Sequence, residues 1–206
     1  MRKITLLLAI MLGTVLSGFA QENFSIRAGY KMPLKNITKP NDPNTQGFEV
    51  GLNYDLKISE NFCFRPGLSY SLMWNRSEKL GNNYFLDGYK TTYPNVNVNE
   101  NSRIKSYANY LEIPLRVALK KGNFDFEVGP YVSFELAQRN TLAGEKISKE
   151  NNYKKFDLGF KGSFGYNIME KYYIGISYEN GVINNLKDSR TKDYTQNLSF
   201  NLGYRF

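Results

Sequence analysis

The residues that could carry catalytic chemistry in this 206-residue chain are carboxylates, because histidine is absent and Cys63 is the single cysteine. Without histidine, the chain cannot build a Ser-His-Asp or Cys-His arrangement, a His-ligated zinc site or an HExxH motif. Carboxylates such as Glu112 and Glu127 could still act as a general acid and base. The favoured alternative is that both belong to a structural network of ion pairs. We therefore expect a protein that is not an enzyme.

No motif in the sequence predicts a cofactor or a metal ion. The segment NDPNTQG, from Asn41 to Gly47, offers oxygen ligands, but its spacing does not fit a calcium-binding loop. The chain also lacks a glycine-rich phosphate loop and a CxxC pair. A single cysteine excludes an intrachain disulfide, and Cys63 is expected to be a small buried residue rather than a reactive thiol. We expect no catalytic residue, no cofactor and no metal site.

The first twenty residues have the pattern of a secretory signal peptide. A basic start, MRK, precedes an apolar run from Ile4 to Leu16, and small residues follow in SGFA. The apolar run is shorter than the ~20 residues that a membrane-spanning helix needs. The sequence therefore predicts a signal peptide over residues 1–20, cleavage between Ala20 and Gln21, and one exported domain over residues 21–206.

Apolar and polar residues alternate along the whole of this predicted domain. In the last stretch, LSFNLGYRF, the residues from Leu198 to Phe206 at even positions are apolar and those between them are mostly polar. A period of two predicts β-strands, and helical periodicity is weak. The predicted strands span residues 24–32, 47–58, 62–74, 107–120, 124–137, 156–166, 172–180 and 198–206. Eight is an even number, as bacterial single-chain barrels require.

The connections between the predicted strands alternate strictly in length. Three are short, namely ISEN, KKGN and NIMEK, and the four longer ones span residues 33–46, 76–103, 138–154 and 182–193. Outer-membrane barrels have short periplasmic turns and long external loops. A soluble barrel of the lipocalin type also has eight strands, but nothing in its physics requires this alternation.

The two faces of the predicted strands favour a membrane barrel over a soluble one. One face is apolar and rich in bulky aromatic residues, which a narrow eight-stranded interior cannot hold on every strand. The other face carries charges of both signs between glycine and serine. The sequence thus predicts an all-β, eight-stranded, antiparallel up-and-down transmembrane β-barrel. We expect ion pairs to plug its lumen, formed by Arg27, Glu49, Arg65, Glu112, Arg116, Glu127, Asp157, Lys161, Glu179 and Arg205.

Aromatic residues near the strand ends predict two girdles at the membrane interfaces. One girdle would contain Phe24, Phe62, Phe124, Tyr166, Tyr172, Tyr204 and Phe206. The other would contain Tyr30, Phe48, Trp74, Tyr107, Phe134, Phe156, Tyr178 and Tyr194. Three prolines do not fit regular strands, because each removes a donor from the hydrogen-bond ladder of a closed sheet. We expect a β-bulge beside each of them, Pro66, Pro114 and Pro130.

Two segments, YLEIPLRVALK (Tyr110 to Lys120) and VGPYVSF (Val128 to Phe134), resemble the PorT-like outer-membrane β-barrel family of Gram-negative bacteria. With the predicted signal peptide and the terminal Phe206, the resemblance covers nearly all of the exported domain. It implies an eight-stranded barrel, similar to the OmpA/OmpX type, which the barrel-assembly machinery inserts into the outer membrane. It also implies that this machinery reads an assembly signal at Leu202, Tyr204 and Phe206. A named member of the family takes part in the secretion of surface proteins.

Specific function is expected in the external loops, where such barrels vary. The longest loop, residues 76–103, places aromatic residues among Asn, Gly and Lys, a mixture that suits contact with a protein or glycan surface. These candidate contact residues are Tyr84, Phe85, Tyr89 and Tyr93. The alternative is a mobile, solvated loop, or an extension of the third and fourth strands above the membrane. We also expect contact with membrane lipid and with lipopolysaccharide phosphates, and no binding of nucleic acid.

Two functions follow as hypotheses. The first is a non-enzymatic outer-membrane barrel that contributes to envelope structure or to surface contact through its external loops. The second is an accessory subunit of a secretion or transport assembly in the outer membrane. A soluble ligand-binding barrel is a further, less favoured alternative.

Overall fold

The computed structural model describes residues 23–34, 44–76, 95–97, 99, 102–147, 154–185 and 193–206. The strands are β1 (Phe24–Pro33), β2 (Asn44–Tyr54), β3 (Leu56–Lys57), β4 (Phe62–Arg76), β5 (Ile104–Lys121), β6 (Phe124–Leu142), β7 (Glu145–Ile147), β8 (Phe156–Ile168), β9 (Tyr172–Gly181) and β10 (Gln196–Arg205). Within these described ranges, no helix is long and apolar enough to cross a membrane.

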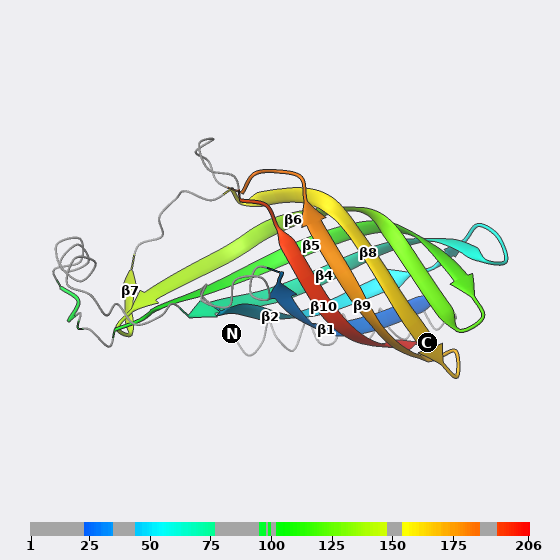
Figure 1. The fold of residues 1–206 in the computed structure, drawn as a ribbon, viewed down its shortest axis with the longest axis horizontal. Helices are drawn as coiled ribbons and strands as arrows, with labels where there is room; N and C mark the ends of the chain where they lie inside the picture. The colour runs from blue at the N-terminus through cyan, green and yellow to red at the C-terminus, as the bar shows by residue number, and fades with distance from the viewer. Residues whose placement is uncertain are drawn as a thin grey trace, which may run out of the picture.

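The strands form one closed, antiparallel barrel (Figure 1). Each wall strand pairs with its neighbours in the chain, and β10 closes the ring by pairing with β1. Strand β3 continues β2 beyond Asp55 and pairs with β4, while β7 folds back on β6. The wall therefore has eight strands, β1, β2, β4, β5, β6, β8, β9 and β10. The predicted fold is confirmed.

The short connections and the chain terminus share one end of the barrel, which we call the turn end (Figure 1). The tight turn between β5 and β6 places Gly122 at φ +58°, a conformation that glycine adopts without steric cost. The backbone N–H of Phe206 donates to the carbonyl oxygen of Phe24 at 3.0 Å, which ties the last strand to the first. The strands that precede the long connections end at the opposite side of the barrel, and we call this side the loop end.

Strands β5 and β6 are longer than predicted and extend past the other strands at the loop end (Figure 1). They contain 18 and 19 residues, whereas β1, β9 and β10 contain 10 each. The extension continues into the β6–β7 hairpin, whose turn is formed by Ala143 and Gly144, both at positive φ. Part of the connection expected between residues 138 and 154 is therefore regular β-structure.

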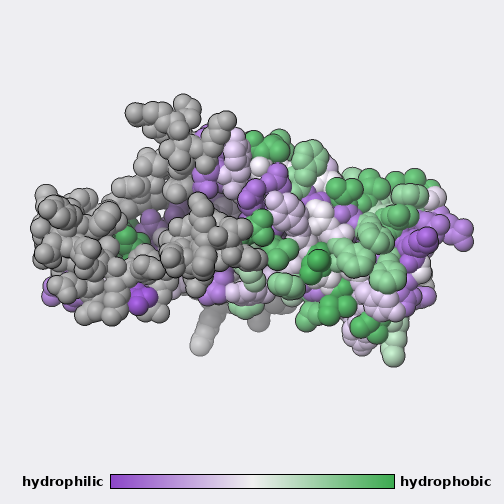
Figure 2. Space-filling view, in the orientation of Figure 1, coloured by the Kyte–Doolittle hydropathy of each residue, from purple (hydrophilic) through white to green (hydrophobic). Residues whose placement is uncertain are grey.

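Apolar side chains cover the outside of the barrel, and polar side chains fill its interior. Figure 2 shows hydrophobic residues gathered over the wall, with hydrophilic residues at the tip of the turn end. The exposed set includes Val50, Leu68, Ile113, Val128, Phe160, Ile174, Ile176, Phe200 and Leu202. The buried set consists mainly of charged residues, serines and asparagines. A soluble barrel needs the reverse arrangement, so the soluble alternative is wrong.

Aromatic rings contact one another across neighbouring strands at both ends of the wall. At the turn end, the ring centroids of Tyr204 lie 5.6 Å from Tyr172 and 5.2 Å from Phe206. At the loop end, the centroids of Phe48 and Trp74 are 5.4 Å apart. These contacts join residues predicted for the same girdle.

The three strand prolines do not cause bulges, and this prediction is wrong. The pairing of Pro66 with Leu115 and the pairing of Ser69 with Glu112 keep the same register. Between these two pairs the residues of β4 and β5 are not paired in the ladder, but neither strand contains an extra residue. The same holds on the other side of β5, where Pro114 pairs with Tyr131 and Val117 with Val128. The side chains near the prolines therefore keep their predicted inward or outward directions. The register shift in this part of the sheet lies elsewhere, between Asn109 and Tyr110.

Gly129 lies in this interrupted part of the ladder, where β5 and β6 approach closely. A Cβ atom at Gly129 would collide with the backbone oxygen of Leu115 and lie 2.7 Å from the Cα of Arg116. Because backbone atoms cannot rotate away, we expect Gly129→Ala to lower the free energy of unfolding by ~1–3 kcal/mol. The matched control is Gly162→Ala, since the nearest atom to its Cβ is 3.8 Å away. Urea unfolding in lipid vesicles, followed by Trp74 fluorescence, measures both, and equal stabilities would contradict the expectation.

Candidate functional site in the barrel lumen

The charged side chains inside the barrel form two groups. The turn-side group consists of Arg27, Asp55, Arg65, Arg116, Lys120, Asp125, Glu127 and Arg205. The central group consists of Lys31, Glu49, Glu112, Lys161 and Glu179. Period-two alternation on every wall strand delivers these residues to the interior, because successive side chains point to opposite faces of a sheet.

Arg65 is fully buried and contacts all three carboxylates of the turn-side group. Its guanidinium holds both oxygens of Asp55, and its Nη1 lies 2.9 Å from Asp125 Oδ2 and 2.5 Å from Glu127 Oε1. Glu127 also receives Arg27 Nη1 at 2.6 Å and Arg116 Nη1 at 2.7 Å. Each of the three buried carboxylates is thus opposed by more than one cation, which is the arrangement that makes buried ions tolerable.

An aromatic ring adds to this group on the side of β9. The guanidinium carbon of Arg27 lies 3.8 Å from the ring centroid of Tyr173, a cation–π contact. Gly165 and Gly175 lie against this ring, and a Cβ atom on either glycine would collide with it. The glycines on the inward face therefore provide the room that a narrow lumen needs for Tyr173.

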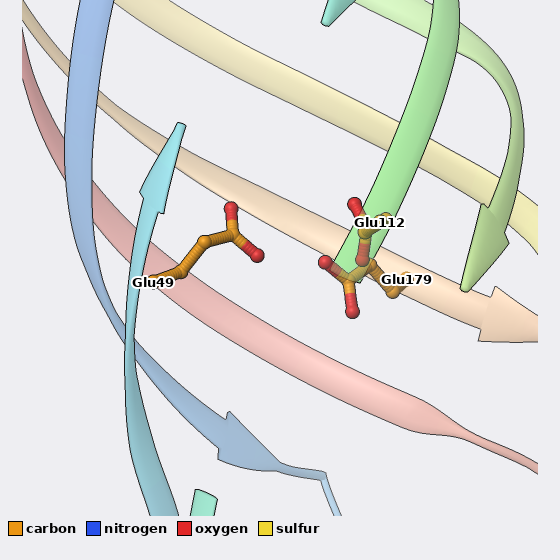
Figure 3. Close-up of side chains that lie close together, drawn as sticks. All are labelled: Glu49, Glu112 and Glu179. Atoms are coloured by element: carbon orange, nitrogen blue, oxygen red, sulfur yellow. The ribbon is translucent and has the colours of Figure 1, made fainter. Parts of the chain in front are cut away.

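The central group places three carboxylates around two lysines. Figure 3 shows Glu49, Glu112 and Glu179 extending inward from β2, β5 and β9. Lys161 Nζ lies 3.0 Å from Glu49, 2.8 Å from Glu112 and 2.7 Å from Glu179. Lys31 Nζ lies 2.6, 3.5 and 2.8 Å from the same three residues. Carboxylate oxygens this close together could hold a metal ion, but the two ammonium groups already supply the opposing positive charge.

A cavity of ≈ 580 Å³ lies above the central group, and we call it the vestibule. Lys31, Glu112 and Glu179 form its floor. On its wall, the hydroxyl of Tyr131 donates to Asp157 Oδ2 at 2.8 Å. A smaller cavity, of ≈ 10 Å³, lies between the central and turn-side groups. The charged groups thus separate the vestibule from the turn end.

All ten residues predicted for the lumen point inward. Asp157 belongs to neither group and instead accepts the bond from Tyr131. Glu112 and Glu127 lie in different groups and do not form a carboxylate pair. Four further members of the network were not among the predicted residues, namely Lys31, Asp55, Lys120 and Asp125. Each has the inward parity of its strand, so the same pattern could have identified it.

The structure describes only some of the remaining predicted sites. Residues 1–20 and the loop residues Tyr84, Phe85, Tyr89 and Tyr93 lie outside the described residues. Leu202, Tyr204 and Phe206 lie on the outer side of the last strand and at its end. Their role as an assembly signal stays a prediction.

A family model described as "Outer membrane protein beta-barrel domain" matches residues 12–187. The chain belongs to this family. Membership of the outer-membrane β-barrel family agrees with a closed eight-stranded wall that is apolar outside and charged inside. The protein is therefore an outer-membrane β-barrel protein, and its long connections correspond to the external loops of such barrels.

The chain is similar to solved structures of other outer-membrane proteins. Ail, the attachment invasion locus protein of Yersinia pestis, in complex with the heparin analogue sucrose octasulfate, is 14% identical with a TM-score of 0.50, covering 90% of this chain and 100% of Ail. Neisserial surface protein A is 12% identical with a TM-score of 0.48, covering 89% and 97%. The outer membrane enzyme PagL is 7% identical with a TM-score of 0.41, covering 88% and 99%. A comparison with curated protein sequences finds no match.

Proposed function

We propose that this protein is a non-enzymatic, non-conducting outer-membrane barrel that acts in envelope structure or surface contact through its external end. The observation that carries the proposal is the lumen, in which two groups of ion pairs cross the barrel below the vestibule. When the lumen is closed in this way, the surfaces available for contact are the apolar wall, which faces lipid, and the external end of the barrel. Specific interactions then belong to the external surface.

The interior carboxylates support a structural role rather than a catalytic one. Glu127 contacts three arginines, and a carboxylate held by several cations is a poor general base, because those cations stabilise its ionised form. Glu112 is fully engaged as the ion-pair partner of Lys31 and Lys161. Cys63, the single thiol, is buried beside Arg65 at 3.9 Å and has no histidine to activate it.

The extension of β5 and β6 supports a contact surface at the loop end. These strands project beyond the wall with the β6–β7 hairpin (Figure 1) and carry regular β-structure toward the exterior. We propose that this extension and the loop between β4 and β5 present the contact residues, with Tyr84, Phe85, Tyr89 and Tyr93 among them. Lipopolysaccharide phosphates are the proposed partners of the surrounding lysines and arginines.

The wall portions of β5 and β6 carry the observation that favours a second candidate function, that of an accessory subunit in a secretion or transport assembly. The PorT-like segments lie side by side on β5 and β6, where Pro114 pairs with Tyr131 and Glu112 with Ser133. We propose that the chain is a PorT-like member of its family, exported by the signal peptide over residues 1–20. The assembly machinery would then read Leu202, Tyr204 and Phe206 on the last strand.

Deleting residues 81–99 is expected to abolish surface contacts and to leave the barrel folded, because no wall strand is cut. Folding is checked by heat-modifiable migration on gels, and contacts by pull-down from detergent extract followed by mass spectrometry. The control is Glu60→Ala, which alters the turn end. Loss of insertion would show that the loop is structural, and unchanged partners would contradict the proposed contact site. Capture of secretion components by the intact protein would favour the second candidate function.

A further inference from the structure

The small cavity between the two ion-pair groups has the size of one small guest. Its volume of ≈ 10 Å³ is about the space that one water molecule needs. Arg27 and Arg116 of the turn-side group border it from one side, and Lys161 of the central group borders it from the other. Glu49 is the carboxylate in its lining. Three cations and one carboxylate therefore surround the space.

Three hydrogen-bond donors at this cavity have no acceptor. They are the Nε of Arg27, the Nε of Arg116 and the Oγ of Ser163, all buried. The two arginine side chains are only 9% and 4% exposed, so bulk water does not serve them. A buried charged donor without a partner is costly, and such a group calls for an unseen guest. The cavity is the place where that guest fits.

Glu49, Asn53 and Ser177, three residues whose acceptors line the cavity, are already engaged. Both oxygens of Glu49 receive lysine ammonium groups, and Asn53 Oδ1 accepts from Arg116 Nη2. Ser177 Oγ accepts from Asn201 Nδ2 at 3.0 Å. A water molecule also has protons to donate, whereas the free Nε–H groups of Arg27 and Arg116 can only donate. A guest that only accepts matches these two groups better.

The charges that line the cavity favour an anionic guest. Three cations, Arg27, Arg116 and Lys161, border it against one carboxylate, Glu49. We propose that this cavity binds a single monatomic anion, chloride in the cell, between Arg27, Arg116, Lys161 and Ser163.

Bromide is the probe that distinguishes a halide from a water molecule. Crystals of the full barrel grown in sodium bromide should show an anomalous peak in this cavity, within hydrogen-bond distance of Arg116 Nε and Ser163 Oγ. Bromide bound elsewhere on the surface serves as the internal positive control. Density without an anomalous signal would identify water and overturn the proposal.

Thermal unfolding in detergent provides a second test in solution. Chloride should raise the unfolding midpoint above that in gluconate at equal ionic strength, because gluconate is too large for the cavity. Ser163→Ala should weaken chloride binding about tenfold by removing one hydrogen bond to the ion. Ser133→Ala, which alters a serine of the vestibule wall, should keep the full chloride effect. Equal midpoints in the two salts, or equal responses of the two variants, would contradict the anion site.

Discussion

Replacing Arg65 with methionine is expected to lower the free energy of unfolding of the barrel by ~3–5 kcal/mol. Methionine keeps most of the side-chain volume, so the change removes mainly the positive charge. Asp55 would then retain Lys120 and Arg205, while Asp125 and Glu127 would lose their closest buried partner. Urea unfolding in lipid vesicles, followed by Trp74 fluorescence, gives the difference in free energy.

The control for Arg65 is Lys57→Met, which removes an exposed positive charge from the short strand β3. An exposed charge interacts weakly with its surroundings, so this variant should stay within ~0.5 kcal/mol of the native protein. If the two variants are equally stable, the turn-side group contributes no net stability and the lumen must be hydrated.

Placing a charge on the outer wall is expected to destabilise the barrel according to depth. Ile176 is 45% exposed in the middle of β9, and Ile176→Arg should cost ~2–4 kcal/mol if that position meets the centre of the bilayer. Ile168 is also 45% exposed but ends β8 beside a turn, and Ile168→Arg should cost ~0–1 kcal/mol. Unfolding from vesicles measures both variants. Equal costs at the two positions would contradict a wall that faces hydrocarbon in its middle.

The strands and their faces could be predicted because a single local rule governs them. Period-two alternation places Ile176 outside and Ser177 inside whatever the rest of the chain does. The ring order also follows from the chain, since each strand pairs with the next. The lengths of β5 and β6 could not be predicted, because their extensions are stabilised by pairing with each other rather than by an alternating apolar face.

The grouping of charges inside the lumen could not be predicted from parity. Lys161 meets Glu49 and Glu112 across the barrel, on strands that do not pair with its own strand β8. Which side chains meet there depends on the stagger between strands, and the sequence pattern does not contain that quantity. The wrong prediction of β-bulges beside the prolines has a similar origin. Whether a missing donor produces a bulge depends on the facing strand, where Gly129 allows close approach without an inserted residue.

Conductance in planar lipid bilayers tests the central claim, a wall that spans the membrane around a lumen closed by ion pairs. Purified barrel that migrates as the folded form on unboiled gels is added to the bilayer, with a general porin as the positive control. We expect insertion without steady single-channel current, because the central and turn-side groups fill the path between the vestibule and the turn end. Large, steady single-channel currents from the native protein would contradict it.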